Sequence, residues 1–156
     1  MLSLSKPEPF AVKKCWRVLL VDDEKFNHEI LELSLNRTDF SLMSATSVAE
    51  AMKIVASAPP DILITDAMMP GESGFSLIEK IRSQPQTANL PIILWTVLEQ
   101  PDGSVMDASR KADFTVSKPF YHSTILEALD KARDMVEFRA IAESRMPVVS
   151  DVQFVF

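Results

Sequence analysis

The chain has 156 residues, and its 47% hydrophobic and 24% charged content is typical of one globular domain and excludes an intrinsically disordered protein. Three glycines are too few for a glycine-rich nucleotide loop, while one cysteine and two histidines exclude a disulfide framework and most zinc sites. The formal net charge of −6 disfavours direct binding to nucleic acid. No apolar stretch approaches the roughly 20 residues of a membrane span, so we expect a cytoplasmic protein.

Five short apolar runs are spread evenly along the chain, at residues 16–21, 41–45, 62–65, 91–95 and 114–116. The runs alternate little between apolar and polar residues, which is typical of strands that are buried on both faces of a sheet. Their starts are separated by 20 to 30 residues, as required for a strand, a crossover helix and the next parallel strand.

Helical periodicity separates the apolar runs. Ser47 and Glu50 form a capping box, which predicts where the second helix begins. The apolar positions that mark five helices are, in chain order, Phe26, Ile30 and Leu33; Val48, Ala51 and Val55; Leu77, Ile78 and Ile81; a weaker set of Val105, Ala108 and Ala112; and Ile125, Leu129, Ala132 and Val136. A strand and a helix repeated five times predict an α/β fold with a doubly wound five-stranded parallel sheet, a (βα)5 flavodoxin-like three-layer sandwich.

The two ends of the chain fall outside this pattern. We interpret residues 1–14 as a flexible N-terminal lead, and residues 138–156 as an extended helix end followed by an apolar tail after Pro147. The tail is interpreted either as a linker or a segment packed on its own domain, or as a docking strand or dimerisation element. The chain is accordingly a stand-alone domain or the front piece of a longer protein.

Polar residues follow four of the predicted strands, where the site of an open α/β sheet lies. Asp22 and Asp23 follow the first strand, Asp66 ends the third, Thr96 ends the fourth, and Lys118 follows the fifth. Each has an ordinary explanation when taken alone, such as a helix N-cap, a turn or a solvated charge. Because the carboxyl ends of parallel strands share one edge of the sheet, we expect these side chains to converge.

Converging carboxylates need a cation. Two carboxylates 4 Å apart repel each other by about 4 kcal/mol at an effective dielectric constant near 20, and each raises the pKa of the other. A hard divalent cation such as Mg²⁺ prefers oxygen ligands and shares its shell with phosphate. With such charge compensation a carboxylate can attack phosphorus and form an aspartyl phosphate, while the metal, an ammonium and a hydroxyl meet the developing charge.

Four sequence motifs carry a resemblance to a known family. They are Val-Leu-Leu-Val-Asp-Asp-Glu at 18–24, Ile-Leu-Ile-Thr-Asp-Ala-Met-Met-Pro-Gly at 62–71, Ile-Ile-Leu-Trp-Thr at 92–96 and Val-Ser-Lys-Pro-Phe at 116–120. As a set, these motifs are highly specific. The chain resembles the receiver domain of two-component response regulators, in the CheY-like superfamily, over residues 15–137.

The resemblance implies a role for each of the converging residues. Asp66 matches the phospho-accepting aspartate, and Lys118 matches the lysine whose ammonium pairs with the oxygens of that aspartate. Lys118–Pro119 matches a peptide bond that is typically cis in the family. Asp23 matches the direct Mg²⁺ ligand, and Asp22 the acid that holds metal-bound water. The remaining matches are Met68, which lends a backbone carbonyl to the metal, and Thr96, whose hydroxyl turns toward the phosphoryl group.

The resemblance also implies partners. The phosphoryl donor would be a phosphohistidine on a sensor histidine kinase or phosphotransfer protein, and phosphorylation would remodel the face around the fourth helix, fifth strand and fifth helix to bind an effector. A homodimer through this face or through the C-terminal tail is possible, and no direct contact with nucleic acid or membrane is expected. Such bacterial two-component proteins act as enzymes only in assisting their own phosphorylation and dephosphorylation.

Two positions of the expected switch depart from the family pattern. Val97 follows Thr96 where a small residue is common, so it either crowds the phosphoryl pocket, slowing small phosphodonors and prolonging the acyl phosphate, or serves packing alone. Thr115 stands where the family usually has an aromatic switch residue, and strand alternation points the adjacent Phe114 to the opposite face. Thr96, Val97 and Thr115 are therefore the candidate switch residues, with a weakened coupling expected.

Three other functions compete with a phosphorylated receiver. A receiver-fold interaction module that works without phosphate remains open because of Val97 and Thr115. An aspartyl-phosphate hydrolase would need a second aspartate where Met68 stands. A flavin-binding protein of the flavodoxin type would need a phosphate loop after the first strand, where Asp-Asp-Glu repels phosphate. His28 and His122 are expected in solvated or capping positions, without a catalytic role.

Overall fold

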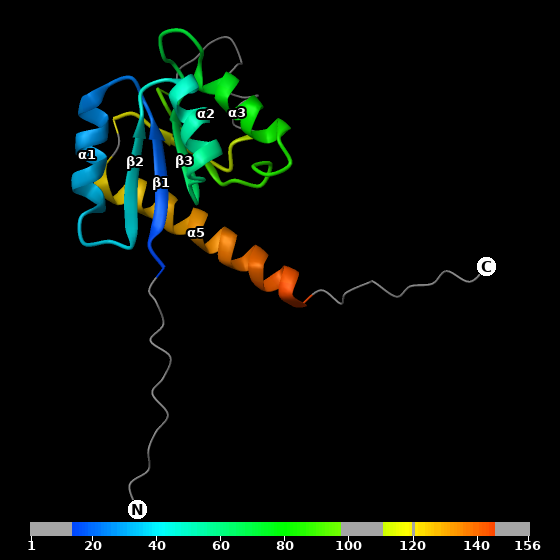
Figure 1. The fold of residues 1–156 in the computed structure, drawn as a ribbon. Helices are drawn as coiled ribbons and strands as arrows, with labels where there is room; N and C mark the ends of the chain where they lie inside the picture. Colours follow the sequence, from blue (N-terminus) through cyan, green and yellow to red (C-terminus); the bar gives the residue numbers. More distant parts are fainter. Residues whose placement is uncertain (1–13, 98–110, 120, 146–156) are drawn as a thin grey trace, which may run out of the picture.

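The computed structural model describes residues 14–97, 111–119 and 121–145. Five parallel strands form one sheet in the order β2-β1-β3-β4-β5 (Figure 1). They are β1 (Trp16–Val21), β2 (Phe40–Ala45), β3 (Ile62–Asp66), β4 (Ile92–Thr96) and β5 (Phe114–Ser117). The predicted doubly wound α/β fold is confirmed, and each strand lies within one residue of the bounds expected from its apolar run.

Helices cover both faces of the sheet. They are α1 (Lys25–Leu35), α2 (Val48–Ser57), α3 (Gly74–Ser83) and α5 (His122–Arg145). Figure 1 shows α1 and α5 on one face and α2 and α3 on the other, and the buried side chains divide into two clusters in the same way. Of the residues that mark the predicted fourth helix, Val105 and Ala108 lie outside the described residues, as do residues 1–13 of the predicted lead and the predicted tail after Pro147.

Alternation along the strands supplies both cores. In β3, Ile62 and Ile64 belong to the cluster under α1 and α5, whereas Leu63 belongs to the cluster under α2 and α3. All three are fully buried, and each such side chain contributes roughly 1.5–3 kcal/mol relative to an exposed position. Two helical layers therefore require apolar side chains on both faces of this strand, which is why its apolar run showed little alternation.

Local signals place α2 as expected. Ser47 accepts a hydrogen bond from the backbone N–H of Glu50, and the Glu50 carboxylate accepts one from the backbone N–H of Thr46. Val48, Ala51 and Val55 are buried along this helix. The predicted helix start and its Ser47 cap are confirmed, and the return bond of Glu50 goes to Thr46 instead of Ser47.

The helix α1 forms where its apolar spacing indicated, but the stripe that marked it is not the face that it buries. Phe26 is 66% exposed and Leu33 is 75% exposed, and the buried side chains are His28, Leu31, Ser34 and Leu35. His28 therefore does not occupy the solvated or capping position expected from the sequence. Leu31 and Leu35 form a second stripe four residues apart, and the helix packs with this stripe against the sheet and with His28 bonded to the backbone of Asp22 after β1.

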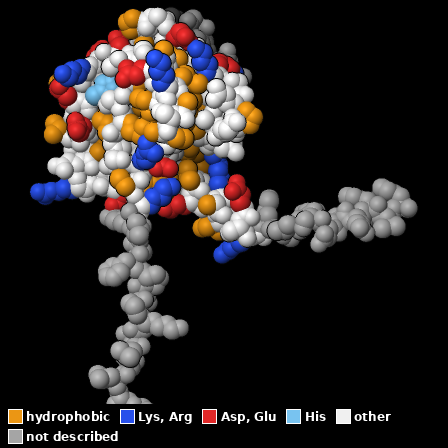
Figure 2. Space-filling view, in the orientation of Figure 1, with side chains coloured by type: hydrophobic (Ala, Val, Ile, Leu, Met, Phe, Trp, Pro, Cys, Tyr) orange, Lys and Arg blue, Asp and Glu red, His pale blue; other side chains and the backbone are white. Residues whose placement is uncertain are grey.

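The long helix α5 extends past the sheet. Its buried residues, Ile125, Ala128, Leu129 and Ala132, all lie in the first half, and Figure 1 shows the second half projecting beyond the strands. Phe138 and Ile141 in the projecting half are exposed. The helices among the described residues include none with the length and apolar character needed to cross a membrane. Figure 2 shows acidic and basic side chains interspersed over the visible face.

Candidate functional site

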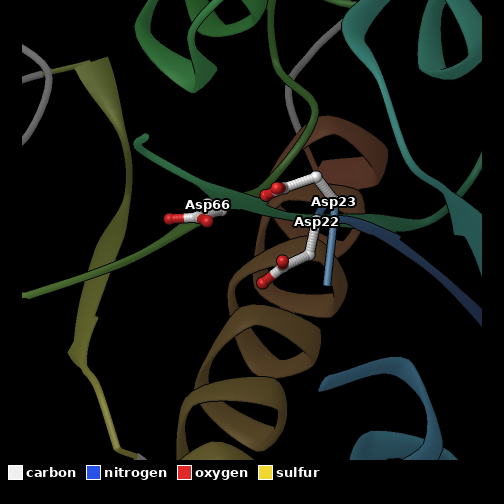
Figure 3. Close-up of side chains that lie close together, drawn as sticks. All are labelled: Asp22, Asp23 and Asp66. Atoms are coloured by element: carbon white, nitrogen blue, oxygen red, sulfur yellow. The ribbon is translucent and has the colours of Figure 1, made fainter. Parts of the chain in front are cut away.

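The sheet register brings the predicted site residues to one edge. Thr65 is paired with Val21, Asp66 with Trp95, and Thr96 with Ser117, so β1, β3, β4 and β5 end side by side. Asp22 and Asp23 follow β1, and Asp66 ends β3. Figure 3 shows their three carboxyl groups gathered together, and one oxygen from each lies within 4.8 Å of the others. The convergence expected from the strand ends is present.

Asp22 is completely buried, and both of its carboxylate oxygens accept hydrogen bonds. Its carboxylate accepts hydrogen bonds from Asn27 Nδ2 at 2.9 Å and from the backbone N–H of Glu24 at 2.8 Å. Its backbone oxygen lies 2.7 Å from His28 Nε2, and because a carbonyl can only accept, this nitrogen carries the proton. Asn27 and His28 thus hold Asp22 in place from the first turns of α1, a role that sequence reasoning missed.

Lys118 bridges two of the acids. Its Nζ lies 3.0 Å from Asp22 Oδ2 and 3.1 Å from Asp66 Oδ2, and the side chain is 17% exposed. Burial pulls the pKa of Lys118 down, but the hydrogen bonds and charges of Asp22 and Asp66 outweigh it, so the pKa lies above its ordinary value. The backbone N–H of Lys118 donates to Thr96 O at 2.9 Å. The Lys118–Pro119 peptide bond is cis.

Asp66 lies in a site that disfavours its charge. The residue is 6% exposed, and burial raises the pKa of its carboxyl group. The Lys118 ammonium and the backbone N–H of Met68, 3.3 Å from Oδ1, lower this pKa, and the Asp22 charge raises it, leaving it above the ordinary value. The Lys118 ammonium therefore offsets only part of the free-energy cost of ionising Asp66. A second cation nearby would stabilise the ionised carboxylate further.

The hydroxyl and switch candidates lie at the end of β4, directly after it, and within β5. Thr96 is 1% exposed, and its hydroxyl donates to Val97 O at 3.3 Å. Val97 and Met68 are each 57% exposed. On β5, Thr115 is exposed, while Phe114 packs against the core cluster under α1 and α5. Thr115 and Phe114 thus face opposite sides of the sheet, the arrangement that strand alternation predicts.

Gly74 determines how closely α3 approaches the end of β3. Its N–H donates to Ala67 O at 3.0 Å, and a Cβ atom built on it would lie 1.8 Å from the backbone oxygen of Asp66. A glycine is therefore required where α3 begins, although sequence reasoning gave this position no role. The signal available in the sequence was a lone glycine eight residues after Asp66, directly before an apolar helical pattern.

A cavity of about 310 Å³ lies beside Lys118. Its apolar walls come from Phe26, Ile30, Trp95 and Pro119. Phe26 is the strongly exposed apolar side chain noted above, so α1 presents an apolar rim next to the acidic cluster.

The donor set fits a hard divalent cation. All three candidate ligands are carboxylates, two of them buried, and their oxygens are near enough to share one ion. Mg²⁺ and similar cations prefer oxygen ligands of this kind. The arrangement therefore offers a cation site, an ammonium and a nucleophilic carboxylate in one place.

Comparison with known proteins defines the class of this arrangement. Residues 18–130 match the response regulator receiver domain family, so the chain belongs to that family. A crystal structure of a putative response regulator from Chloroflexus aurantiacus is similar, with a TM-score of 0.70 and 29% identity, covering 76% of this chain and 98% of that one.

Curated relatives extend the likeness to longer proteins. The phosphate regulon transcriptional regulatory protein PhoB of Pseudomonas aeruginosa is 28% identical over 66% of this chain and 45% of its own length. The sensor histidine kinase TmoS of Ectopseudomonas mendocina is 35% identical over 67% of this chain and 11% of its own length. The chain spans about half or less of the length of the curated relatives it matches.

Proposed function

We propose that this chain is a phosphorelay receiver that accepts a phosphoryl group on Asp66 from a phosphohistidine of a sensor histidine kinase or phosphotransfer protein. The observation that carries the proposal is the Lys118 ammonium bridging Asp22 and Asp66, beside a third carboxylate at the same edge. Membership of the receiver domain family supports the same chemistry.

In the transfer step, an oxygen of the ionised Asp66 carboxylate attacks phosphorus. The new O–P bond forms as the P–N bond to the donor imidazole breaks, and the electron pair of the broken bond stays on the imidazole nitrogen. The Lys118 ammonium is already placed to offset negative charge on Asp66 and on the incoming group. The N–H of Met68 orients the carboxylate through Oδ1.

Asp22, Asp23 and Asp66 are the proposed Mg²⁺ site, together with the backbone carbonyl of Met68. Asp23 is assigned as a direct ligand, and the fully buried Asp22 as the acid that acts through metal-bound water. When bound, the ion would neutralise charge on the three carboxylates and on the transferring phosphoryl group.

Thr96, Val97 and Thr115 are the proposed switch residues. Thr96 ends β4, Val97 follows it and Thr115 lies in β5, the strand next to β4 at the edge of the sheet, so a change at Thr96 would reach that edge strand. Phosphorylation would alter the face formed by the fourth helix, β5 and α5 for binding an effector or a second copy of the chain, and the tail offers another route to a homodimer. Residues 98–110, where most of the predicted fourth helix would lie, and residues 146–156 are outside the described residues.

The phosphoryl donor is proposed to approach over the apolar rim of α1. Phe26 and Ile30 line the cavity beside Lys118, so a donor helix that packs there would bring its histidine to Asp66. We further propose that the protein acts in the bacterial cytoplasm without direct contact with nucleic acid or membrane. Its catalysis would be limited to its own phosphorylation and dephosphorylation.

Intact-mass analysis after incubation with Mg²⁺ and a small phosphodonor tests the proposal. We expect one phosphoryl adduct on the wild type and none on Asp66→Ala or in the presence of a chelator of divalent cations. Asp61→Ala is the matched control, because Asp61 lies at the opposite end of β3 and should leave the adduct unchanged. An unmodified wild type would favour a phosphorylation-independent receiver module, and equal addition to Asp66→Ala would exclude Asp66 as the acceptor.

Val97→Ala tests crowding beside the acceptor. Because the wild-type side chain is β-branched and follows Thr96, we expect alanine to speed phosphorylation by a small phosphodonor and to shorten the lifetime of the acyl phosphate, each by roughly twofold to fivefold. Val97 is 57% exposed, so folding stability should change by less than about 0.5 kcal/mol. Time-resolved intact-mass measurements give both rates, and unchanged rates would leave Val97 with a packing role alone.

A further inference from the structure

Trp95 lies directly behind the candidate site. It is the residue of β4 paired with Asp66 of β3, and it is 1% exposed. Its side chain belongs to the core cluster under α1 and α5, while its backbone oxygen accepts a hydrogen bond from Ala67 N at 3.3 Å. The ring is therefore anchored on the strand next to the acceptor and is held by the core.

The Lys118 ammonium lies over this ring. Its Nζ is 5.0 Å from the centroid of the Trp95 ring, and it is also 3.0 Å from Asp22 Oδ2 and 3.1 Å from Asp66 Oδ2. A cation within about 6 Å of an indole face is attracted by the ring quadrupole, and tryptophan is the strongest aromatic partner. Three groups from three different segments thus define the position of one ammonium.

We propose that Trp95 is a positioning residue, which holds the Lys118 ammonium at Asp66 through its indole face. Lysine is a compact charge on a flexible four-carbon stem, so two carboxylates alone leave its direction poorly determined. The backbone N–H of Lys118 donates a hydrogen bond to Thr96 O. Because Thr96 directly follows Trp95 in β4, this bond holds the Lys118 backbone next to the residue that carries the ring. This inference rests on the proposed function, because it concerns the same phosphoryl transfer.

The ring also matters once a phosphoryl group is present. The ammonium must then turn from the carboxylates toward new phosphoryl oxygens. A π face holds a cation without demanding one hydrogen-bond direction, so Lys118 can turn while it keeps this contact. An aliphatic side chain of similar bulk would fill the core but give the ammonium no such contact.

Substitutions at Trp95 test the proposal in the 156-residue chain. With Mg²⁺ and a small phosphodonor that carries a P–N bond, Trp95→Leu should lower the phosphorylation rate constant roughly threefold to tenfold, as expected for loss of a partly desolvated cation–π contact. Trp95→Phe keeps a π face and should recover part of the loss. In a Lys118→Met background, Trp95→Leu should cause no further fall, because the cation is already gone. An equal fall in both backgrounds would overturn the proposal in favour of a packing role.

A spectroscopic measurement covers the case in which Trp95→Leu folds poorly. Trp16→Phe leaves Trp95 as the single tryptophan. In this background, Lys118→Met should change the emission of Trp95, whereas the matched exposed substitution Lys80→Met should not. Unchanged emission after Lys118→Met would overturn the proposal. Failure of the proposed function can be told apart from failure of this inference. If the proposed function fails, the wild type stays unphosphorylated. If only this inference fails, the wild type is phosphorylated and Trp95→Leu is phosphorylated with the same rate constant.

Discussion

Replacing Gly74 with alanine should destabilise the protein by about 3 kcal/mol, at the upper end of the range for overpacking a folded interior. The new Cβ atom would lie 1.8 Å from the backbone oxygen of Asp66 and 2.8 Å from its carbonyl carbon. Both atoms belong to the backbone of a buried central strand, so no flexible side chain can move aside. The start of α3 must shift instead, which weakens the hydrogen bond from Gly74 N to Ala67 O.

Urea denaturation followed by circular dichroism measures this cost, and Gly71 is the matched control. Gly71 has a φ of +81° but no heavy atom within 4 Å of a built Cβ, so Gly71→Ala should cost only the conformational strain of roughly 1 kcal/mol. Since the collision involves the backbone of Asp66, the proposed acceptor, Gly74→Ala should also slow phosphorylation of the protein that remains folded. A Gly74→Ala variant as stable and as reactive as the wild type would contradict the packing described for α3 and β3.

Replacing Lys118 with methionine should slow phosphorylation of Asp66 roughly a hundredfold, the usual size of the effect when one stabilising donor is removed from a reacting site. The ammonium is bonded to both Asp22 and Asp66, and methionine keeps the length of the stem without the charge. The control is Lys80→Met, which removes an exposed pair with Glu72 and should leave the rate unchanged.

The same substitution should make folding stability depend more strongly on Mg²⁺. Without the metal, two buried carboxylates lose their cation, and because Lys118 keeps 17% exposure we expect a loss of about 2 kcal/mol, below the value for a fully buried pair. An ion that binds only the folded state restores stability, so the difference from the wild type in thermal denaturation should narrow as Mg²⁺ is added. A difference that is independent of Mg²⁺ would argue against a shared site for the lysine and the metal.

Much of this protein could be predicted because its signals are local. Five apolar runs separated by helical patterns indicate parallel strands with crossover helices, and the observed strands begin and end within one residue of those runs. The carboxyl ends of parallel strands share an edge, so Asp22, Asp66 and Lys118 could be placed together from their positions alone. The capping box of α2 was equally readable, because its residues contact each other within one helical turn.

The face of α1 could not be predicted in this way. Its sequence carries one apolar stripe through Phe26 and Leu33 and another through Leu31 and Leu35, and periodicity alone does not rank them. In the structure the second stripe faces the sheet together with His28, which is bonded to the backbone of Asp22, and these contacts form only when the helix packs against the end of β1. The first stripe is thereby left as an exposed rim beside the site.

The sequence by itself determined the doubly wound sheet and the set of acids, hydroxyl and ammonium at its carboxyl edge, because local patterns encode the succession of strands and helices along the chain and the residues at which the strands end. Only the tertiary structure decided which groups hold that set in place. Asn27 donates a hydrogen bond to Asp22, and Gly74 allows the start of α3 to pack closely against the backbone of Asp66. The Trp95 ring lies against the Lys118 ammonium. These contacts join residues from separate elements at distances of a few ångströms, and such distances depend on packing, which no local pattern in the chain records.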